Sequence, residues 1–483
     1  MHIYERGFQF GMGIGMKLMP ASKQKLVSGP GSLTEVPGLL AEQGLEKPLI
    51  VTGPRVSKTD FFQRLVRALK ESGREAAIFN EVEPDPSTDL IGRVISAYES
   101  NGCDCFIALG GGSNMDAAKA AAAALARPGK TLQQLGGVMK VRSRTPYMIA
   151  IPTTAGTGSE CTVAAVVTDS KTHRKFAIND PCLCPDAAVL DADLTAGLPS
   201  HVVAATGMDA LTHAIEAWLN RPYHKRGTPR QCAQAVHDIM MYLPFVYEAA
   251  RAGEKAPAGE QTAAGPPDAV PAVAEIPAAV SAAVTAATEV PATEPAAAET
   301  QAAVTATASV AEEAPASVDM SRARQKLLEA SYLAGQAFTV ACVGNVHAIA
   351  HTLGGLYHIP HGEANAVLLP VILEDYGSKV WRPLAALVRE ARLEHLLGST
   401  VPQGSATGAL HTEQNEHLAE TLIARIRQMN REMGLPETFS QIREEEFDQM
   451  AAWATKEANP LYPVPVIYGP EDVKRILRQV SRI

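Results

Sequence analysis

The stretch Cys103–Ala126, CDCFIALGGGSNMDAAKAAAAALA, decides the fold. It begins with an apolar run typical of a buried strand, continues through three glycines and ends in an alanine-rich helical run. The same alternation occurs twice upstream. The strand-like run KPLIVTG (47–53) precedes a helical run at about 60–72, and EAAIFNEV (75–82) precedes one at about 89–101. Strands and helices that alternate at this spacing predict an α/β domain with a parallel sheet, which we place at residues 1–193.

Gly110, Gly111, Gly112 and Ser113 stand at the turn between a predicted strand and a predicted helix. Glycine lets the backbone approach a phosphate closely, and a helix N-terminus favours the phosphate charge. The triplet is not the G-x-G-x-x-G fingerprint of the usual dinucleotide fold, and a lone glycine triplet is more often a tight turn. A second loop, 153–160, follows the strand-like run PYMIAIP (146–152), and its hydroxyls and N–H groups suit phosphates and ribose.

The chain changes character after about residue 193, where helical runs replace strands. We therefore predict an all-helical second domain at residues 194–483. Residues 256–321 interrupt it with a segment that contains no lysine, arginine or aromatic residue and is rich in Ala, Val, Pro, Glu and Thr. Such a composition cannot bury enough apolar surface to fold, so we predict a disordered insert in a loop between two helices.

Two helical segments of this second domain carry potential metal ligands. In GMDALTHAIEAW (207–218), Asp209 and His213 stand four residues apart on an otherwise apolar helix. In GNVHAIAHTLGGLYHIPHGEANAVLLP (344–370), His347 and His351 share a helix face, and His361 follows Pro360. We expect the glycines at 354 and 355 to end the first helix, so that the chain folds back.

Two explanations of these residues stay open. Each histidine alone could be a capping or core histidine, and Asp209 with His213 could form an ion pair. Together, Asp209, His213, His347 and His361 would offer one oxygen and three nitrogen ligands to Zn²⁺ or Fe²⁺ and leave a coordination position for a substrate. We favour metal binding for the set, with His351 close by and unassigned.

The motifs GMDALTHAIEA, VHAIAHTLGG, PHGEANAVLLP and GGGSNMDAAK resemble those of the iron-containing alcohol dehydrogenase family. The resemblance implies a dehydroquinate-synthase-like fold, with an α/β dinucleotide-binding domain before an all-α metal-binding domain. It implies that Asp209, His213, His347 and His361 bind a divalent metal, Fe²⁺ by family resemblance, with Zn²⁺ as the alternative. His351 matches the family's histidine near the nicotinamide, and we expect it to relay the alcohol proton.

The resemblance also identifies the residues that we expect to contact NAD or NADP. These are Gly53, Gly110, Gly111, Gly112, Ser113, Asp116, Thr153, Thr154, Thr157, Ser159 and Lys175. One position departs from the family, which often has an aspartate where this chain has Gly53. An acidic residue there would bind the ribose 2′-hydroxyl and repel a 2′-phosphate. Its absence, with Arg55 and Lys58 nearby, predicts that NADP(H) is accepted.

Composition limits the other functions. A net charge of −9 gives no basic surface for nucleic acid, and no apolar run approaches the length of a membrane span. An odd number of cysteines, seven, favours reduced thiols in the cytoplasm. The resemblance implies a homodimer.

We therefore predict an NAD(P)-dependent alcohol dehydrogenase. It would interconvert primary alcohols or diols with aldehydes by hydride transfer, with the alkoxide bound to the metal. The alternatives are a metal- and nicotinamide-dependent lyase of the dehydroquinate-synthase type, an inactive scaffold whose insert binds partners, and a plain metal hydrolase. The stretch around His347 lacks the Arg and Lys cluster that the lyase needs, and a hydrolase would leave the glycine loops unexplained.

Overall fold

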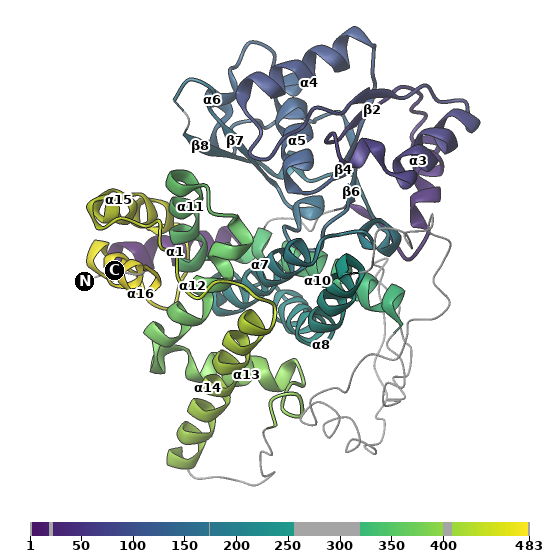
Figure 1. The fold of residues 1–483 in the computed structure, drawn as a ribbon. Helices are drawn as coiled ribbons and strands as arrows, with labels where there is room; N and C mark the ends of the chain where they lie inside the picture. The colour runs from purple at the N-terminus through teal and green to yellow at the C-terminus, as the bar shows by residue number, and fades with distance from the viewer. Residues whose placement is uncertain (1, 19–22, 173, 256–318, 399–407, 482–483) are drawn as a thin grey trace.

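The computed structural model describes residues 2–18, 23–172, 174–255, 319–398 and 408–481. A part built around a parallel sheet lies above a part built of helices (Figure 1). This arrangement confirms the predicted α/β and all-α fold class. The last strand of the main sheet ends at Leu190, and the first long helix of the second part begins at Ser200.

The main sheet has six parallel strands in the order β1-β9-β6-β4-β2-β3. The strands are β1 (Lys25–Ser28), β2 (Pro48–Val51), β3 (Ala77–Phe79), β4 (Cys105–Gly110), β6 (Tyr147–Pro152) and β9 (Ala187–Leu190). The helices that alternate with them are α2 (Val36–Glu42), α3 (Asp60–Glu71), α4 (Thr88–Ser100) and α5 (Gly112–Ala126). Every residue of the central strand β4 is buried, because helices cover both faces of the sheet.

The two faces of β4 enter two different hydrophobic clusters. Phe106 and Ala108 pack with residues of α4 and α5, whereas Ile107 and Leu109 pack with residues of α2 and α3. This division follows from the two-residue side-chain period of a strand. The packing holds the carboxyl end of β4, and therefore the glycine loop, in a fixed place.

A small second sheet, in the order β5-β8-β7, was missing from the sequence prediction. It consists of β5 (Gly137–Val138), β7 (Ala164–Thr168) and β8 (Lys175–Asn179), and the short helix α6 (Leu132–Leu135) precedes it. β7 and β8 pair antiparallel. A strand of two residues leaves no periodic pattern that could be recognised in the sequence.

The helical part is built around α7 (Ser200–Leu219), which is buried along most of its length. The other helices are α8 (Thr228–Lys255), α10 (Met320–Ala341), α11 (Asn345–Tyr357), α12 (His361–Tyr376), α13 (Ser378–Glu390), α14 (Gly408–Glu432), α15 (Phe447–Ala458) and α16 (Pro470–Val480). Among the described residues, no single helix is long and apolar enough to cross a membrane, and only the bent pair α10 and α11 passes that test jointly.

The predicted insert, 256–321, lies outside the described residues except for its last three positions. Asp319 is the N-cap residue of α10, and Met320 and Ser321 form its start, so the predicted end of the insert lies three residues too far along the chain. The carboxylate of Asp319 accepts hydrogen bonds from the backbone N–H groups of Ser321 and Arg322, which is the chemistry of a helix N-cap.

Helix α1 (Ile3–Leu18) lies beside the C-terminal helices, at the edge of the helical part (Figure 1). The Arg6 guanidinium donates to the carbonyl of Val464 at 2.8 Å, and the Gln9 amide donates to the carbonyl of Tyr462 at 2.8 Å. The large apolar side chains of Tyr4 and Phe10 on this helix are exposed. The predicted first domain includes these residues by number, although they contact the second part. The division at residue 193 therefore stays a prediction.

Candidate metal centre

Four side chains from three helices converge in the helical part. Asp209 and His213 come from α7, His347 from α11 and His361 from α12, and each offers one donor atom. All four donor atoms lie within 4.8 Å of one another. His361 Nε2 lies 3.5 Å and His347 Nε2 lies 3.8 Å from Asp209 Oδ1. The structure thus brings together the four residues that the sequence singled out.

Local sequence explains why His361 reaches this place. α11 continues through Gly354 and Gly355 to Tyr357, so the predicted end of the helix at the glycine pair was wrong by three residues. The helix ends at His358, which adopts a left-handed conformation with φ of 55°. Pro360 then caps α12, whose first residue is His361. The reversal brings the start of α12 next to the face of α11 that carries His347.

The donor groups have the protonation state that a metal requires. Burial lowers the pKa of His213 and lowers that of His347 well below its ordinary value, and neighbouring imidazoles lower the pKa of His347 further. Loss of surrounding water lowers the pKa of His361 to about 4, although the Asp209 carboxylate opposes the change. All three imidazoles are therefore neutral at pH 7, and neutral imidazole is the form that binds a metal.

Two further observations fit a divalent cation. His213 Nδ1 is buried and has no hydrogen-bond partner, which is costly unless another group satisfies the ring. The side-chain amide nitrogen of Asn365 lies 2.6 Å from Asp209 Oδ1 and 3.1 Å from Nε2 of both His347 and His361. Three acceptor atoms thus point at one small, positively polarised group. The donor set has no sulfur, and it suits Fe²⁺ or Zn²⁺.

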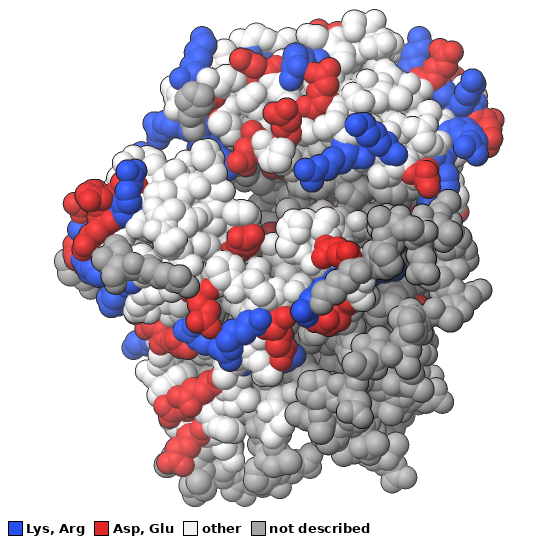
Figure 2. Space-filling model, in the orientation of Figure 1, with Lys and Arg blue, Asp and Glu red and all other residues white. Residues whose placement is uncertain are grey.

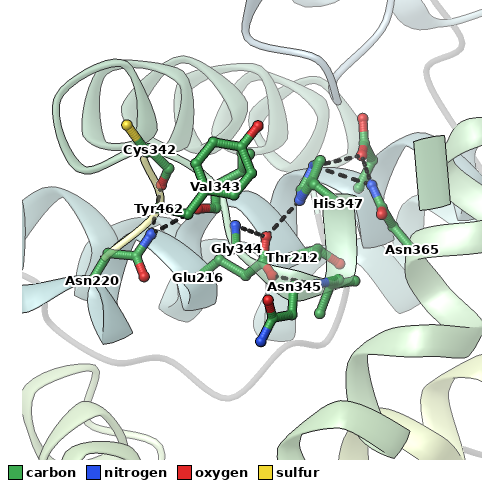
Figure 3. Close-up of polar contacts among 12 residues, drawn as sticks. Thr212, Glu216, Asn220, Cys342, Val343, Gly344, Asn345, His347, Asn365 and Tyr462 are labelled. Atoms are coloured by element: carbon green, nitrogen blue, oxygen red, sulfur yellow. Dashed lines mark hydrogen bonds and ion pairs between the residues drawn. The ribbon is translucent and has the colours of Figure 1, made fainter. Parts of the chain in front are cut away.

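Behind His347 lies a carboxylate that the sequence analysis missed. Glu216 Oε2 is 2.6 Å from His347 Nδ1, and the backbone N–H groups of Gly344 and Val346 donate to the same carboxyl group at 2.7 Å (Figure 3). Burial raises the pKa of Glu216, and the hydrogen bonds from Gly344, Val346 and His347 oppose the rise because they stabilise the ionised carboxylate. One signal was present in the sequence: Glu216 follows His213 by three residues and shares its helix face.

His351 lies at the border of the cluster. Its ring stacks on that of His361 with a centroid distance of 5.2 Å, and its Nδ1 lies 2.7 Å from Glu457 Oε1 on α15. The Tyr462 hydroxyl donates to the same carboxylate oxygen at 2.9 Å. Burial lowers the pKa of His351, but the charge and hydrogen bond of Glu457 outweigh it and raise the pKa overall. The side chain is 42% exposed, so a proton on this ring can exchange with solvent.

The two predicted phosphate loops lie against each other. Gly110, at the end of β4, has φ of 143°, and a side chain there would collide with the amide of Asn114. A β-carbon at Gly111 would lie 3.6 Å from the Thr154 hydroxyl, and one at Gly112 would lie 3.0 Å from a methyl group of Thr157. The backbone conformation of Gly110 therefore favours glycine, and a side chain at Gly112 would press on Thr157. Ser113 lies in the first turn of α5.

Asp116 and Ser159 connect the loops from the inside. The Ser159 hydroxyl donates to Asp116 Oδ1 at 3.1 Å, and the Val166 N–H donates to Asp116 Oδ2 at 3.2 Å. Burial raises the pKa of Asp116 to about 6. The fully buried Lys119, one turn further along α5, donates to backbone and hydroxyl oxygens of Ser159 and Thr162. Lys119 has no role among those predicted from the sequence.

Gly53 and Lys175 lie on either side of these loops. Gly53 follows β2 and is buried, and a β-carbon there would lie 3.0 Å from the carbonyl oxygen of Val82. Arg55 and Lys58 are exposed beside it. Lys175 on β8 pairs with Asp85 at 2.7 Å, and its charge also acts on His351 and His361. Lys175 thus lies in the electrostatic range of the histidine cluster although it belongs to the other part of the molecule.

The surface is hollowed where the sheet-containing part meets the helical part, and positively charged side chains lie along the upper border of the hollow (Figure 2). The glycine loops at the carboxyl ends of β4 and β6 face this boundary from above, and α7 and α11 form part of the region below it (Figure 1). In α/β proteins, ligands bind in the crevice outside the carboxyl ends of the strands.

Known proteins share this architecture. Residues 23–192 match the family model described as iron-containing alcohol dehydrogenase, and residues 281–481 match that of the C-terminal part of the Fe-containing alcohol dehydrogenase family. The NAD-dependent methanol dehydrogenase of Bacillus methanolicus is 28% identical over 427 residues, which cover 88% of this chain and 90% of that protein. The NADPH-dependent butanol dehydrogenase of Clostridium saccharobutylicum is 30% identical over 424 residues, which cover 87% and 86%.

Among solved structures, that of a 1,3-propanediol oxidoreductase superposes with a TM-score of 0.73 at 27% identity. The match covers 94% of this chain and 97% of that one. The similarity therefore extends over both the sheet-containing and the helical part.

Proposed function

The chain belongs to the iron-containing alcohol dehydrogenase family and is an NAD(P)-dependent alcohol oxidoreductase, and on this premise we propose its substrates and its site. It interconverts primary alcohols or diols with the corresponding aldehydes. Asp209, His213, His347 and His361 hold the divalent metal. The observation that carries this assignment is the convergence of their four donor atoms within 4.8 Å of one another.

The residues of the chain divide the chemical work. When bound, the metal would act as a Lewis acid at the substrate oxygen, and nicotinamide would carry the hydride. The three neutral imidazoles and the single carboxylate supply only one negative charge, so the site leaves a divalent cation electron-poor. His351 takes the alcohol proton in oxidation and passes it to solvent, since its ring is partly exposed and hydrogen-bonded to Glu457. The two glycine loops hold the phosphates of the dinucleotide.

We propose Fe²⁺ as the metal in the cell, on the grounds of family membership. The donor set by itself binds Zn²⁺ more tightly, because affinity for a nitrogen and oxygen site follows the Irving–Williams order. Metal analysis of protein purified without oxygen, compared with protein purified in air, separates the two. Zinc alone under both conditions would contradict the iron assignment.

NADP(H) is accepted alongside NAD(H). The relatives named above include one described as NAD-dependent and one described as NADPH-dependent, so the family context allows either. Because position 53 is glycine, no carboxylate there repels a 2′-phosphate. The exposed Arg55 and Lys58, close in sequence, carry positive charge that favours the phosphate. The ratio of kcat/KM for the two cofactors tests this point. A strong preference for NAD would be evidence against it, and Gly53→Asp should shift the ratio toward NAD.

The ligand set and the reaction are tested together by metal content and by formation of NAD(P)H from ethanol, 1-butanol and 1,3-propanediol. We expect about one divalent ion per chain, and loss of both metal and activity in Asp209→Ala and His361→Ala. His417→Ala, which changes an exposed histidine on α14, is the matched control. Stoichiometric metal without alcohol oxidation would favour the lyase alternative. Neither metal nor cofactor binding would favour the scaffold alternative.

We also propose a homodimer that acts in the cytoplasm. All seven cysteines are free thiols in the structure, which supports a reducing compartment. The exposed side chains of Ile3, Tyr4 and Phe10 on α1 support an outer face that a second copy covers. Sedimentation equilibrium of wild-type protein and of the variant Tyr4→Ser/Phe10→Ser tests the assembly. A monomer at micromolar concentration would contradict the first proposal, and an unchanged dimer in the variant would exclude α1.

A further inference from the structure

One face of α7 carries four polar residues in register. Asp209, His213, Glu216 and Asn220 follow one another at intervals of four, three and four residues, so they form a single stripe along the helix. All four are buried. The first two are the proposed ligands of the metal. The last two contact the connection between α10 and α11, which lies directly before the ligand His347 (Figure 3).

The contacts of this second pair leave the connection little freedom. The Asn220 amide donates to the carbonyl oxygens of Ala341, Cys342 and Val343 at 3.0, 3.0 and 2.9 Å. Glu216 Oε2 accepts from the N–H of Gly344 at 2.7 Å, and Oε1 accepts from the N–H of Val346 at 2.7 Å. The carboxylate thus caps the N-terminus of α11, where no side chain of α11 itself provides a cap.

The same carboxylate reaches the ligand. Glu216 Oε2 lies 2.6 Å from His347 Nδ1, while His347 Nε2 faces Asp209 and Asn365. A neutral imidazole that binds a metal through Nε2 must carry its proton on Nδ1, and an acceptor at Nδ1 fixes both this tautomer and the ring orientation. Glu216 is only 4% exposed, and His347 only 2%, so water does not take over this function.

We propose that Glu216 is a positioning residue for the metal centre: it holds His347 with Nε2 turned toward the metal. The proposal rests on the proposed ligand set. In this arrangement Asp209 and His213 on α7 bind the metal directly. Further along the same face of α7, Glu216 aligns the third ligand, His347, which belongs to α11. Gly344 leaves room for this carboxylate, because a β-carbon at position 344 would lie only 2.6 Å from Glu216 Oε1.

Glutamine at position 216 provides the sharpest test. Three N–H donors, from Gly344, Val346 and His347, converge on two carboxylate oxygens, and the glutamine amide offers only one oxygen. One donor must lose its acceptor, or His347 must move its proton to Nε2, where a metal cannot bind. We expect Glu216→Gln to weaken the binding of Zn²⁺ and Co²⁺ by roughly 10- to 100-fold.

The measurement is a chelator competition for Zn²⁺, together with the visible absorption spectrum of the Co²⁺-loaded protein. The spectrum reports ligand geometry, which a purely structural role of Glu216 would not change. Glu160→Gln is the matched control, because it makes the same change at another buried glutamate, in the sheet-containing part. An unaltered dissociation constant and cobalt spectrum in Glu216→Gln would overturn the proposal.

A second pair of variants covers the case in which Glu216→Gln does not fold. Gly344→Ala should crowd the carboxylate and weaken metal binding, whereas Gly355→Ala, on the same helix with open space around it, should not. Equal metal affinity in the two glycine variants would count against the proposal. Its failure differs from failure of the proposed function: wild-type protein that binds metal but oxidises no alcohol refutes only the function. Wild-type protein that binds no metal refutes both.

Discussion

At the scale of single residues, the proposed proton acceptor His351 and its partner Glu457 should set the pH range of alcohol oxidation. The Glu457 carboxylate, 2.7 Å from Nδ1, raises the pKa of His351. A proton acceptor in alcohol oxidation works only when deprotonated, so the acid limb of the pH profile follows this pKa. Glu457→Gln keeps the shape but removes the charge, and the acid limb of kcat/KM for oxidation should therefore move to lower pH.

The pH profile of oxidation by wild type and Glu457→Gln, with metal content measured in parallel, checks this expectation. Glu446→Gln, which changes an acidic residue just before α15, is a suitable control. An acid limb that stays at the same pH in Glu457→Gln would show that His351 does not govern it.

A second prediction for a single residue concerns the pH dependence of stability that Glu160 causes. Burial raises the pKa of Glu160 to about 7, from an ordinary value of 4.5. Between these two pH values the folded chain binds the proton more tightly than the unfolded chain, so stability falls as pH rises from 4.5 to 7. The cost over this window is on the order of 3 kcal/mol. Glu160→Gln should remove this part of the pH dependence.

Melting temperatures of wild type and Glu160→Gln at pH 5 and pH 8 test the sign. At pH 8 the melting temperature of Glu160→Gln should rise relative to that of wild type. The control Glu35→Gln, at an exposed position, should melt like wild type at both pH values. A variant that gains nothing at pH 8 would mean that Glu160 does not hold its proton in the folded chain.

The sequence predicts single residues well only where they share an element. Asp209 with His213, and His347 with His351, were recognisable because helix geometry aligns residues four apart. Glu457 could not be identified, because it lies 106 residues from the histidine that it contacts. Nearness in sequence can also mislead. His358 lies in the same histidine-rich stretch, yet it is the C-cap residue of α11, in a left-handed conformation, and not one of the four donors.

At the scale of elements, Lys119 ties helix α5 to the second glycine loop. Its ammonium group is fully buried and donates to Ser159 and Thr162, and at 3.1 Å to the carbonyl of Ala164. Lys119→Met would keep the apolar stem but leave these buried acceptors unpaired. We expect a loss of stability of about 3 kcal/mol or more and a raised KM for the dinucleotide, because the loop loses its anchor.

Thermal unfolding and the KM for NAD(P)H measure the two effects. Lys70→Met, at the exposed end of α3, removes an equal charge without a buried contact and serves as the control. If both variants behave alike, Lys119 is not the link between α5 and the loop.

Elements were predicted where their periodic patterns are long. The strand, loop and helix of 103–126 appear in the structure as β4 and α5, since burial on both faces of a strand and an alanine-rich helix leave clear patterns. α1 was not predicted, because it points exposed apolar residues outward and packs through polar ones such as Arg6 and Gln9. α1 therefore lacks the apolar, core-facing stripe by which the other helices were recognised.

At the scale of the whole molecule, the candidate centre depends on three helices that are far apart in the chain. α7 begins at Ser200 and α11 at Asn345, so no local pattern could fix the distances among the four donors. The sequence supplied the donor types, and packing of α7 against α11 and α12 supplied their convergence. The same separation means that a metal bound by the four donors would join segments which the backbone does not connect directly.

Removal of the metal should therefore loosen the helical part more than the sheet. A ligand that binds only the folded state stabilises it by about 4 kcal/mol at 1,000 times its dissociation constant. Chelation should lower the melting temperature, and readdition of Zn²⁺ should restore it. Amide hydrogen exchange should speed up in α7, α11 and α12 and stay unchanged in β2, β4 and β6, whose contacts do not include the cluster.

The Asn365 amide limits the size of this effect. It already bridges Asp209, His347 and His361 without a metal, so the chelated protein should stay folded rather than collapse. Asp209→Ala is the control, because it should melt at the same temperature with and without Zn²⁺. An equal rise in exchange across α7 and β4 would mean that the metal stabilises the molecule as one unit. If exchange changes in neither α7 nor β4, the metal does not bind where the four donors converge.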